Sequence, residues 1–360
     1  MKKGIAVAGN ITLDYIYPVN HYAQVGELVT IEANLTKTTG GAVCNVIVDL
    51  AKLDPALPLT ALGVIGAASC AGAADGTRGP DAICNPDGTR CPDEAGKFIE
   101  ATLSNYPNID LSQIAHEGVT SFTAVISDLT SKQRTFFHYR GANARFSEKH
   151  IPWDRLQVDL LHIGYPLLLD ELDQPDEEFG TKMARLLAAV QRKGIKTSID
   201  LVSDPENRYK AIVPPALKYT DYCVINELEA ERTTGIALRD NQGILAGNID
   251  AALTALKAFG VSEWAIIHAP EGGYGLNCVT GEVIKQKSLP LPQDYIKGTT
   301  GAGDAFCAGV LYGAYLEKSL PEAIELGIAC ATCSLSEPGA TEGMSSYYEV
   351  LKLYEKLKKT

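Results

Sequence analysis

The sequence of 360 residues lacks several features that would place it in particular classes of protein. No segment approaches the roughly 18 consecutive apolar residues that suggest a membrane-spanning helix. Positive charge is also scarce, because 32 Lys and Arg residues stand against 44 Asp and Glu residues, for a formal net charge of −12. Nucleic acids and anionic lipids attract proteins mainly through Lys and Arg, so we expect no nucleic-acid partner and no membrane partner.

Disulfide scaffolding and two common nucleotide motifs are missing as well. The nine cysteines are scattered and odd in number, unlike those of a secreted disulfide-rich domain. The apolar run Ile5–Gly9 follows two lysines and is typical of a buried first strand, so we expect a cytoplasmic protein. No G-x-G-x-x-G follows that strand and no Walker A sequence G-x-x-x-x-G-K-S/T is present, which argues against a dinucleotide oxidoreductase and a P-loop protein.

What the sequence does contain is an alternation of short apolar, β-branched runs with helical patterns. This alternation is typical of a mostly parallel sheet with helices on both faces, so the predicted fold class is α/β. The predicted strands cover 5–8, 59–65, 160–164, 196–200, 222–225 and 264–268, and the predicted helices cover 45–53, 94–105, 179–193, 227–234 and 249–259.

Two stretches, about 13–38 and 117–140, break this rhythm. Polar and apolar residues alternate there with period two, as in Arg134–His138, which fits half-exposed antiparallel strands. We expect them to form one small sheet that covers a crevice as a lid. No Pro/Ser-rich linker separates a second domain, so residues 1–360 are predicted to form a single domain.

A third stretch, about 67–92, is rich in Gly, Ala, Asp, Pro and Cys. Such a composition indicates a long loop, and we expect an inserted, flexible flap. Its cysteines, Cys70, Cys84 and Cys91, leave a metal or redox clip open as an alternative, although they contain no C-x-x-C pair.

The motif with the clearest chemistry lies near the C-terminus, where Lys297-Gly-Thr-Thr-Gly-Ala-Gly-Asp304 precedes a small, apolar, helix-like run. Gly301 and Gly303 have no Cβ, so the backbone from Gly301 through Ala302 to Gly303 can turn tightly and present N–H groups to an anion at the positive end of a helix dipole. Asp304 would then lie beside a phosphoryl group, placed to accept the proton of an attacking hydroxyl. A glycine and an aspartate at a helix start also serve as a simple turn and cap, so this local pattern has two interpretations.

The run Thr299-Thr-Gly-Ala-Gly-Asp304 resembles the C-terminal signature of the ribokinase-like carbohydrate kinases, the PfkB family. Other segments resemble family motifs in the same order, namely Gly9-Asn-Ile-Thr-Leu-Asp14, Thr39-Gly-Gly-Ala-Val-Cys-Asn45 and Arg140-Gly-Ala-Asn143. The resemblance implies that the substrate is bound by Asp14, Gly41, Asn45 and Asn143.

The resemblance also extends to the expected nucleotide side. Asn226-Glu-Leu-Glu229 matches the family's N-x-x-E pattern, which organises Mg²⁺ and the ATP phosphates, largely through water. Mg²⁺ prefers few carboxylates and many waters, so Glu229 is the expected metal residue, acting through water. The resemblance implies nucleotide binding by Asn226, Glu229, Thr299 and, from a glycine-containing loop of ambiguous register, Gly273.

Taken as a whole, the resemblance implies a ribokinase-like three-layer α/β/α sandwich with a mostly parallel central sheet and a small β-sheet lid. The implied activity is ATP- and Mg²⁺-dependent phosphorylation of a hydroxyl on a sugar or sugar-like molecule, with Asp304 as the base. A nucleoside kinase of the same superfamily and a non-catalytic sugar-binding relative remain alternatives. The resemblance leaves open whether two lids pair in a homodimer, as in many relatives.

A few positions depart from the family pattern or lie outside it. Many relatives carry an aspartate that helps to coordinate an activating monovalent cation where this chain has Gly298, so we expect little activation by potassium. The pair Cys330-x-x-Cys333 lies in an apolar, helix-like run and is interpreted as core packing. Three residues at or near predicted strand ends, His162, Tyr165 and Asp200, are secondary candidates for the site.

Overall fold

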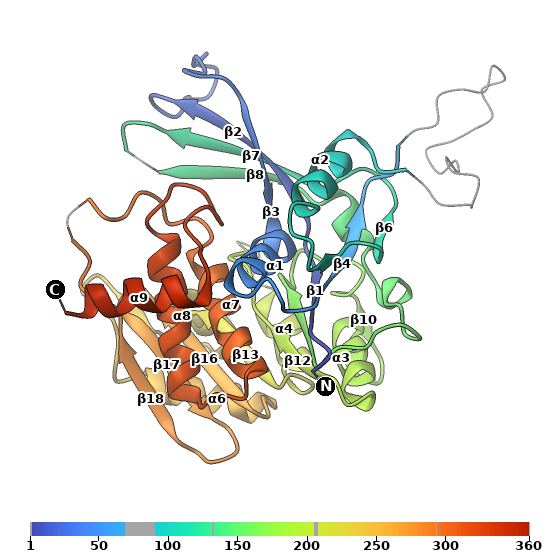
Figure 1. Cartoon of the computed structure of the whole chain (residues 1–360), viewed down its shortest axis with the longest axis vertical. Coiled ribbons are helices and arrows are strands. Elements are labelled where there is room, and N and C mark those ends of the chain that lie inside the picture. Colours follow the sequence, from blue (N-terminus) through green and yellow to red (C-terminus); the bar gives the residue numbers. More distant parts are fainter. Residues whose placement is uncertain (1, 69–90, 132, 205–207, 293, 360) are drawn as a thin grey trace.

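The computed structural model describes residues 2–68, 91–131, 133–204, 208–292 and 294–359. These residues fold around one large sheet that is parallel from β5 to β16 and antiparallel at the edge formed by β17 and β18 (Figure 1). In sheet order the strands are β18 (Val283–Lys287), β17 (Gly272–Asn277), β16 (Trp264–Ala269), β13 (Tyr222–Asn226), β12 (Lys196–Ile199), β9 (Leu160–Gly164), β1 (Ile5–Gly9), β4 (Leu59–Ile65) and β5 (Ile109–Asp110), and β6 (Ile114–His116) also pairs with β4.

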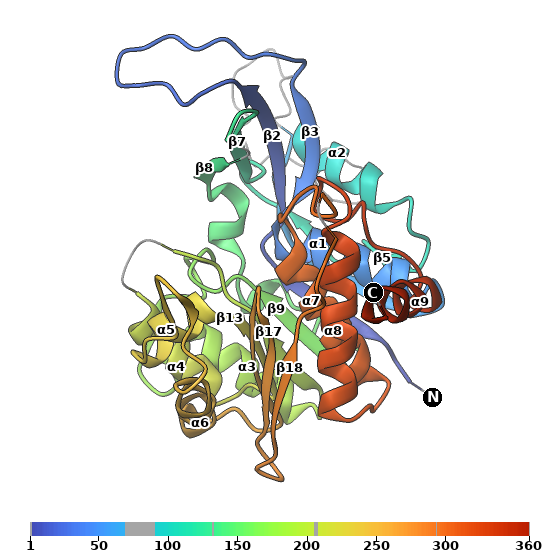
Figure 2. The ribbon, with the colours of Figure 1, turned by 90° about the vertical axis from the view of Figure 1, so that its left-hand side faces the viewer.

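Helices cover both faces of this sheet, and Figure 2 shows the three layers from the side. The central strands β1 and β9 are buried along their whole length, as expected for parallel strands covered on both faces. One apolar core lies against α1 (Gly41–Leu53), α2 (Glu94–Leu103), α7 (Ala302–Tyr315), α8 (Leu320–Ser334) and α9 (Tyr347–Lys358). The other lies against α3 (Lys182–Arg192), α4 (Tyr209–Leu217), α5 (Glu227–Thr234) and α6 (Ile249–Phe259). The predicted α/β/α sandwich is confirmed.

The predicted strands and helices recur in the structure, but some ends are shifted and some elements, among them β17, β18 and α9, were not predicted. The helix predicted from 45 begins at Gly41. The helix predicted from 179 begins only at Lys182, because β11 (Gly180–Thr181) pairs with β10 (Pro175–Asp176) and the Thr181 hydroxyl caps the helix by accepting from Ala184 N at 3.1 Å. Helix α4 was not predicted, since Pro214 and Pro215 lie inside it and proline normally interrupts a helix. A further small hairpin joins β14 (Arg239–Asp240) and β15 (Gly243–Ile244).

A second sheet stands at one end of the main body, as Figures 1 and 2 both show. Its strands fall almost wholly within the two predicted stretches, in the order β3 (Thr36–Gly40), β2 (Thr12–Val19), β7 (Phe122–Asp128) and β8 (Arg134–Tyr139). The prediction that these strands are antiparallel holds for β2 with β3 and for β7 with β8. It is wrong for β2 with β7, which pair in parallel because the two hairpins meet side by side with their first strands in the same direction.

The predicted insertion is described only at its base. The Ala68 N–H donates to the Cys91 carbonyl at 2.8 Å, and Ala67 forms an isolated bridge with Pro92, so the two ends of the loop are held together. The predictions of a flexible flap, and of a clip that would use Cys70 and Cys84, concern residues 69–90, which lie outside the described residues.

The edge of the sheet beneath the lid is where most of the predicted site residues lie. Parallel strands present their carboxyl ends at one edge, and ligands of open α/β sheets bind there. Strands β1, β9, β12 and β13 all end at this edge, and α1 and α7 begin close to it. Among the described helices, none combines the length and the apolar character that a bilayer crossing requires.

Candidate active site

Two large cavities and one small one lie at this edge of the sheet. The first, of about 620 Å³, lies beneath the lid and is lined by residues of β2, β7 and β8, by Asn10 just after β1, and by the starts of α1 and α7. The second, of about 600 Å³, lies on the other side of the α7 N-terminus. The third, of about 150 Å³, shares Gly301, Glu229 and Asp304 with the first and Asn226 and Gly303 with the second. The start of α7 therefore separates two spaces of substrate size.

Asp14 and Gly41 form part of the wall of the first cavity. Asp14 is on β2, where its carboxylate accepts from the Thr12 hydroxyl at 3.2 Å, and burial raises its pKa. Gly41 begins α1 with a φ of +82°, and a Cβ there would come within 2.5 Å of the Asn10 carbonyl oxygen, so only glycine fits without movement. Both residues thus line the cavity, and their part in substrate binding stays a prediction.

Asn45 and Asp304 meet at the floor of the first cavity. The Asn45 side chain donates from Nδ2 to Asp304 Oδ2 at 2.8 Å, while its buried Oδ1 has no hydrogen-bond partner among the described residues. Asn45 thus holds one oxygen of the Asp304 carboxylate and keeps an acceptor for another group. The sequence placed both residues at the site but did not predict their direct contact.

Asp304 lies in the first turn of α7 and is 6% exposed. Burial, followed by the nearby charge of Asp200, raises the pKa of its carboxyl from 3.8 to about 7, although hydrogen bonds from Asn45 and Tyr165 oppose the rise. A carboxyl with a pKa near neutrality can both accept and release a proton at physiological pH, which suits a general base.

The turn before Asp304 has the geometry of an anion site. Gly301 has a φ of +79°, and a Cβ on it would collide with the Ala340 carbonyl, so this turn requires glycine. Helix geometry leaves the first amides of α7 without intrahelical acceptors. The Ala302 amide makes a long contact of 3.4 Å with the Thr299 carbonyl, so the Gly301 and Gly303 amides are the better donors for an anion.

Asn226 and Glu229 lie at the third cavity, at the start of α5. Their side chains form a reciprocal cap, in which Asn226 Oδ1 accepts from Glu229 N at 2.9 Å and Glu229 Oε2 accepts from Asn226 N at 3.0 Å. Burial, with added repulsion from Asp200 and Asp304, raises the pKa of Glu229 to about 8. Three acidic groups thus share a small buried space, which is an environment that favours a cation.

The second cavity has a largely apolar wall that includes Leu289, Ile296 and Phe306, and Thr299, Ala302 and Gly303 line its edge near α7. His268 also lines it, and burial lowers the pKa of this imidazole to about 4, so it is neutral.

Two predicted site residues have other positions. Asn143 is fully buried behind the first cavity, and its side chain binds both backbone groups of Ile11, donating to the carbonyl at 2.9 Å and accepting from the N–H at 3.0 Å. It therefore supports the connection between β1 and β2 and is not among the residues that line the cavity. Gly273 packs against Ile324 and Phe306, whereas its neighbour Gly272 lines the second cavity.

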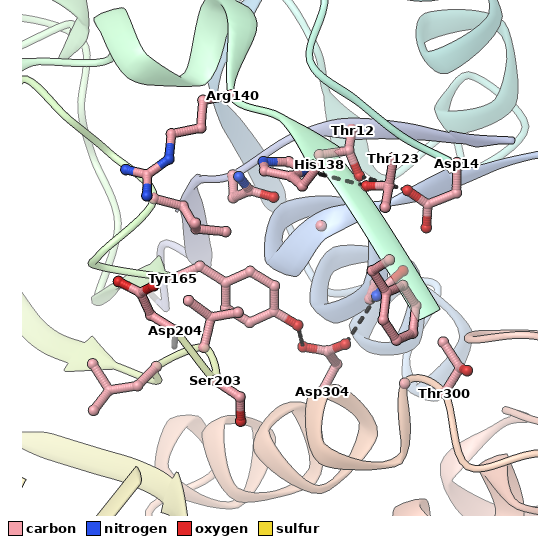
Figure 3. Close-up of a pocket in the computed structure, with 18 of the residues that line it drawn as sticks. Thr12, Asp14, Thr123, His138, Arg140, Tyr165, Ser203, Asp204, Thr300 and Asp304 are labelled. Atoms are coloured by element: carbon pink, nitrogen blue, oxygen red, sulfur yellow. Dashed lines mark hydrogen bonds between the residues drawn. The ribbon is translucent and has the colours of Figure 1, made fainter. Parts of the chain in front are cut away.

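The secondary candidates lie in and beneath the first cavity, as the close-up in Figure 3 shows for Tyr165. The Tyr165 hydroxyl donates to Asp304 Oδ1 at 2.8 Å, and Asp200 Oδ1 accepts from the Tyr165 backbone N–H at 3.0 Å. His162 is fully buried below them, with Nδ1 3.1 Å from the Ser198 hydroxyl. Cys330 and Cys333 are buried in α8, which agrees with core packing.

One contact that the sequence did not suggest joins the lid to the turn before Asp304. Arg134, on β8, donates to the Thr300 hydroxyl and also to the Pro338 carbonyl at 3.2 Å. The lid therefore bridges the mouth of the first cavity and contacts the residue next to Gly301. The available signal was an arginine at the start of a lid strand in which polar and apolar residues alternate. Where its side chain points depends on how the lid folds over the cavity.

Comparison with known proteins agrees with this geometry. The family model of pfkB family carbohydrate kinases matches residues 92–346, which is more than half of the chain. The chain is 24% identical over 360 residues to a ribokinase of Haemophilus influenzae, covering 99% of both chains.

Solved structures show the same fold. Arabidopsis thaliana ribokinase, complexed with ribose and ATP, matches with a TM-score of 0.74 at 20% identity, over 99% of both chains. A nucleoside kinase of Methanocaldococcus jannaschii, an archaeal member of the ribokinase family, matches with a TM-score of 0.70 at 19% identity, over 98% of both chains. The family match, the fold and the order of the motifs together show that this chain belongs to the pfkB family of carbohydrate kinases.

Proposed function

We propose that this chain transfers the γ-phosphoryl group of ATP to a hydroxyl of a sugar or sugar-like molecule held in the first cavity. The observation that carries the proposal is the position of Asp304. Its carboxylate borders the first and third cavities, in the first turn of the helix whose N-terminal amides face the phosphate side. A base at that point lies between an acceptor hydroxyl and a phosphoryl group.

Some residues orient the substrate, and another accepts its proton. Asp14 and the free Oδ1 of Asn45 offer acceptors for substrate hydroxyls, and Asp304 accepts the proton of the hydroxyl that attacks. The amides of Gly301 and Gly303 donate to the oxygens on which charge develops. Arg134 holds the lid against Thr300 and so excludes water from the reacting groups.

The third cavity suits Mg²⁺, because Glu229, Asp200 and Asn226 offer the oxygen ligands that this ion prefers, directly or through water. Bound there, the ion would neutralise phosphate charge and lower the pKa values of the neighbouring carboxyls. The apolar wall of the second cavity suits a planar nucleotide base, with Thr299, Ala302 and Gly303 on the phosphate side.

A nucleoside acceptor is the second candidate. Beyond its polar floor, the first cavity has an apolar side formed by Phe136, Leu168, Leu201 and Val202, which could contact a base as well as a larger sugar. The same phosphate machinery would serve both substrates, so the identity of the acceptor decides between them.

We also propose that two lids pair in a homodimer. On β8, the side chains of Arg134, Phe136 and His138 face the cavity or its mouth, so Phe137 and Tyr139 lie on the opposite face, where they are 63% and 47% exposed. Replacing Phe137 by Ser should convert a dimer to a monomer in light scattering. A wild-type monomer at all concentrations would refute the dimer.

We expect the enzyme to work in the cytoplasm, where ATP is available.

The acceptor is found by measuring ADP release with hexoses, pentoses, sugar acids and nucleosides. We expect acceptor-dependent turnover by the wild-type chain and a kcat about two to four orders of magnitude lower for Asp304→Asn. As a matched control, Asp54→Asn changes an aspartate that also accepts from a tyrosine, Tyr312 at 2.9 Å, but lies outside the cavities. Tight sugar binding without any ATP turnover would instead identify a non-catalytic sugar-binding relative.

A further inference from the structure

The loop after β9 has an unusual backbone. Tyr165 and Leu167 have φ values of +62° and +84°, in the left-handed region that residues with a side chain seldom adopt. Two such residues within three positions, on either side of Pro166, make this a strained segment. Strain of this kind persists only where the surrounding structure holds it, and it is found mainly at functional sites.

Three charged side chains hold this loop. Asp200 Oδ1 accepts from the Tyr165 N–H at 3.0 Å, and Asp173 Oδ1 accepts from the Leu167 N–H at 3.1 Å. Arg208 donates to the Leu167 carbonyl at 2.6 Å. Hydrogen bonds with a charged partner are the stronger ones, so these contacts oppose relaxation of the loop to an ordinary conformation.

The result of this conformation is the position of the Tyr165 side chain. The ring lies in the wall shared by the first and third cavities, and its hydroxyl donates to Asp304 Oδ1 at 2.8 Å (Figure 3). Asn45 donates to the other oxygen, Oδ2, at 2.8 Å. Each carboxylate oxygen still has a second lone pair that can accept a proton or a further hydrogen bond.

We infer that Tyr165 is a positioning residue for Asp304, which fixes the rotation of the carboxylate so that an unused lone pair faces the acceptor hydroxyl. The inference deepens the proposed kinase function and rests on it. Tyr165 and Asn45 grip the carboxylate from opposite sides, and neither contact alone would stop it from turning. A ring that served only to fill space would not require its hydroxyl or the strained backbone.

Several charged or titratable groups surround Asp304 and must be considered in any pH measurement. Asp200 follows β12, Glu229 is on α5, Asp49 is on α1 and His162 is on β9. Replacing Tyr165 by Phe leaves all four in place and removes only the hydroxyl. The variant therefore isolates one hydrogen bond to the carboxylate.

The test compares Tyr165→Phe with Tyr312→Phe, since Tyr312 donates to Asp54 at 2.9 Å away from the cavities. For Tyr165→Phe we expect kcat to fall roughly tenfold or more while KM for the acceptor changes little, because alignment matters at the chemical step. The acid limb of the pH–rate profile should move to higher pH, since a hydrogen bond that favours the charged carboxylate is lost. Tyr312→Phe should change neither quantity.

A second variant covers the case in which Tyr165→Phe does not fold, as judged by thermal unfolding. Incorporating 3-fluorotyrosine at position 165 keeps the ring and the hydroxyl but makes the phenol a stronger donor, so the acid limb should move to lower pH. An unchanged kcat and acid limb in folded variants, with an active wild type, would overturn the role of Tyr165 alone. A wild type without turnover on any acceptor would refute the proposed function and this inference with it.

Discussion

Replacing Asp304 by Asn should lower kcat by orders of magnitude and, at neutral to alkaline pH, stabilise the fold. The substitution keeps the shape of the side chain. Its oxygen can still accept from Asn45, and its amide can donate to the Tyr165 hydroxyl, which is able to accept. What it removes is the base, so kcat should fall by about two to four orders of magnitude.

The stability effect follows from the raised pKa of this carboxyl. A folded-state pKa of about 7, against 3.8 in the unfolded chain, means that folding takes up protons between these values and that stability falls as the pH rises through the interval. The loss amounts to about 4 kcal/mol once the pH exceeds 7. Asn cannot ionise and avoids this loss. From pH 5 to pH 8 the variant should therefore gain about 2–3 kcal/mol relative to the wild type.

Urea denaturation of the ligand-free protein at pH 5 and pH 8 measures this difference. Asp54→Asn serves as the control, because it makes the same chemical change at an aspartate outside the cavities. A difference between Asp304→Asn and wild type that does not change with pH would show that the carboxyl is not buried as described. Appreciable turnover by Asp304→Asn would remove it from the reaction.

Three further predictions follow from the same geometry. The kcat/KM of the wild type should fall about tenfold per pH unit below about pH 7, because the pKa of Asp304 is raised to about 7 and the protonated carboxyl cannot act as the base; a flat profile to pH 5 would contradict this. Arg134→Ala should raise KM for the acceptor about three- to tenfold, because it releases the lid from Thr300. The control Arg185→Ala removes ion pairs with Glu148 and Asp176 away from the cavities and should leave KM unchanged. Equal effects of the two substitutions would argue against the lid contact. Exchange of sodium for potassium should leave the rate nearly unchanged, because position 298 has no aspartate to coordinate the cation. A Cβ at Gly298 would come within 2.6 Å of the Pro338 carbonyl oxygen, so the structure has no room for an aspartate there. A large increase in rate with potassium would contradict this prediction.

The sequence predicted most of the scaffold because the local signals agree with the tertiary structure. Strands β4 and β9 and helices α5 and α6 begin and end where the patterns predicted, since apolar runs, caps and glycines mark their ends. The spacing of Gly301, Gly303 and Asp304 indicates an anion-binding helix start with an acid beside it, so the start of α7 was also predicted from the sequence.

The rest of the site depends on the directions of side chains in the folded chain. Asn143 lies two residues after Gly141 in a family-like segment, yet its side-chain amide binds the backbone of Ile11, 132 residues away in the sequence. The contact of Tyr165 with Asp304 joins residues 139 positions apart in the sequence. It also requires a left-handed backbone conformation at Tyr165, which no local sequence pattern predicts. Such contacts arise only when segments far apart in the sequence are brought together by the fold.

The most direct test of the account is a crystal structure of the chain with Mg²⁺, a non-hydrolysable ATP analogue and the acceptor found by the ADP assay. We predict an acceptor hydroxyl about 2.6–3.2 Å from an Asp304 oxygen, and a terminal phosphate bound by the Gly301 and Gly303 amides. A terminal phosphate bound elsewhere, or an acceptor hydroxyl out of reach of Asp304, would contradict it.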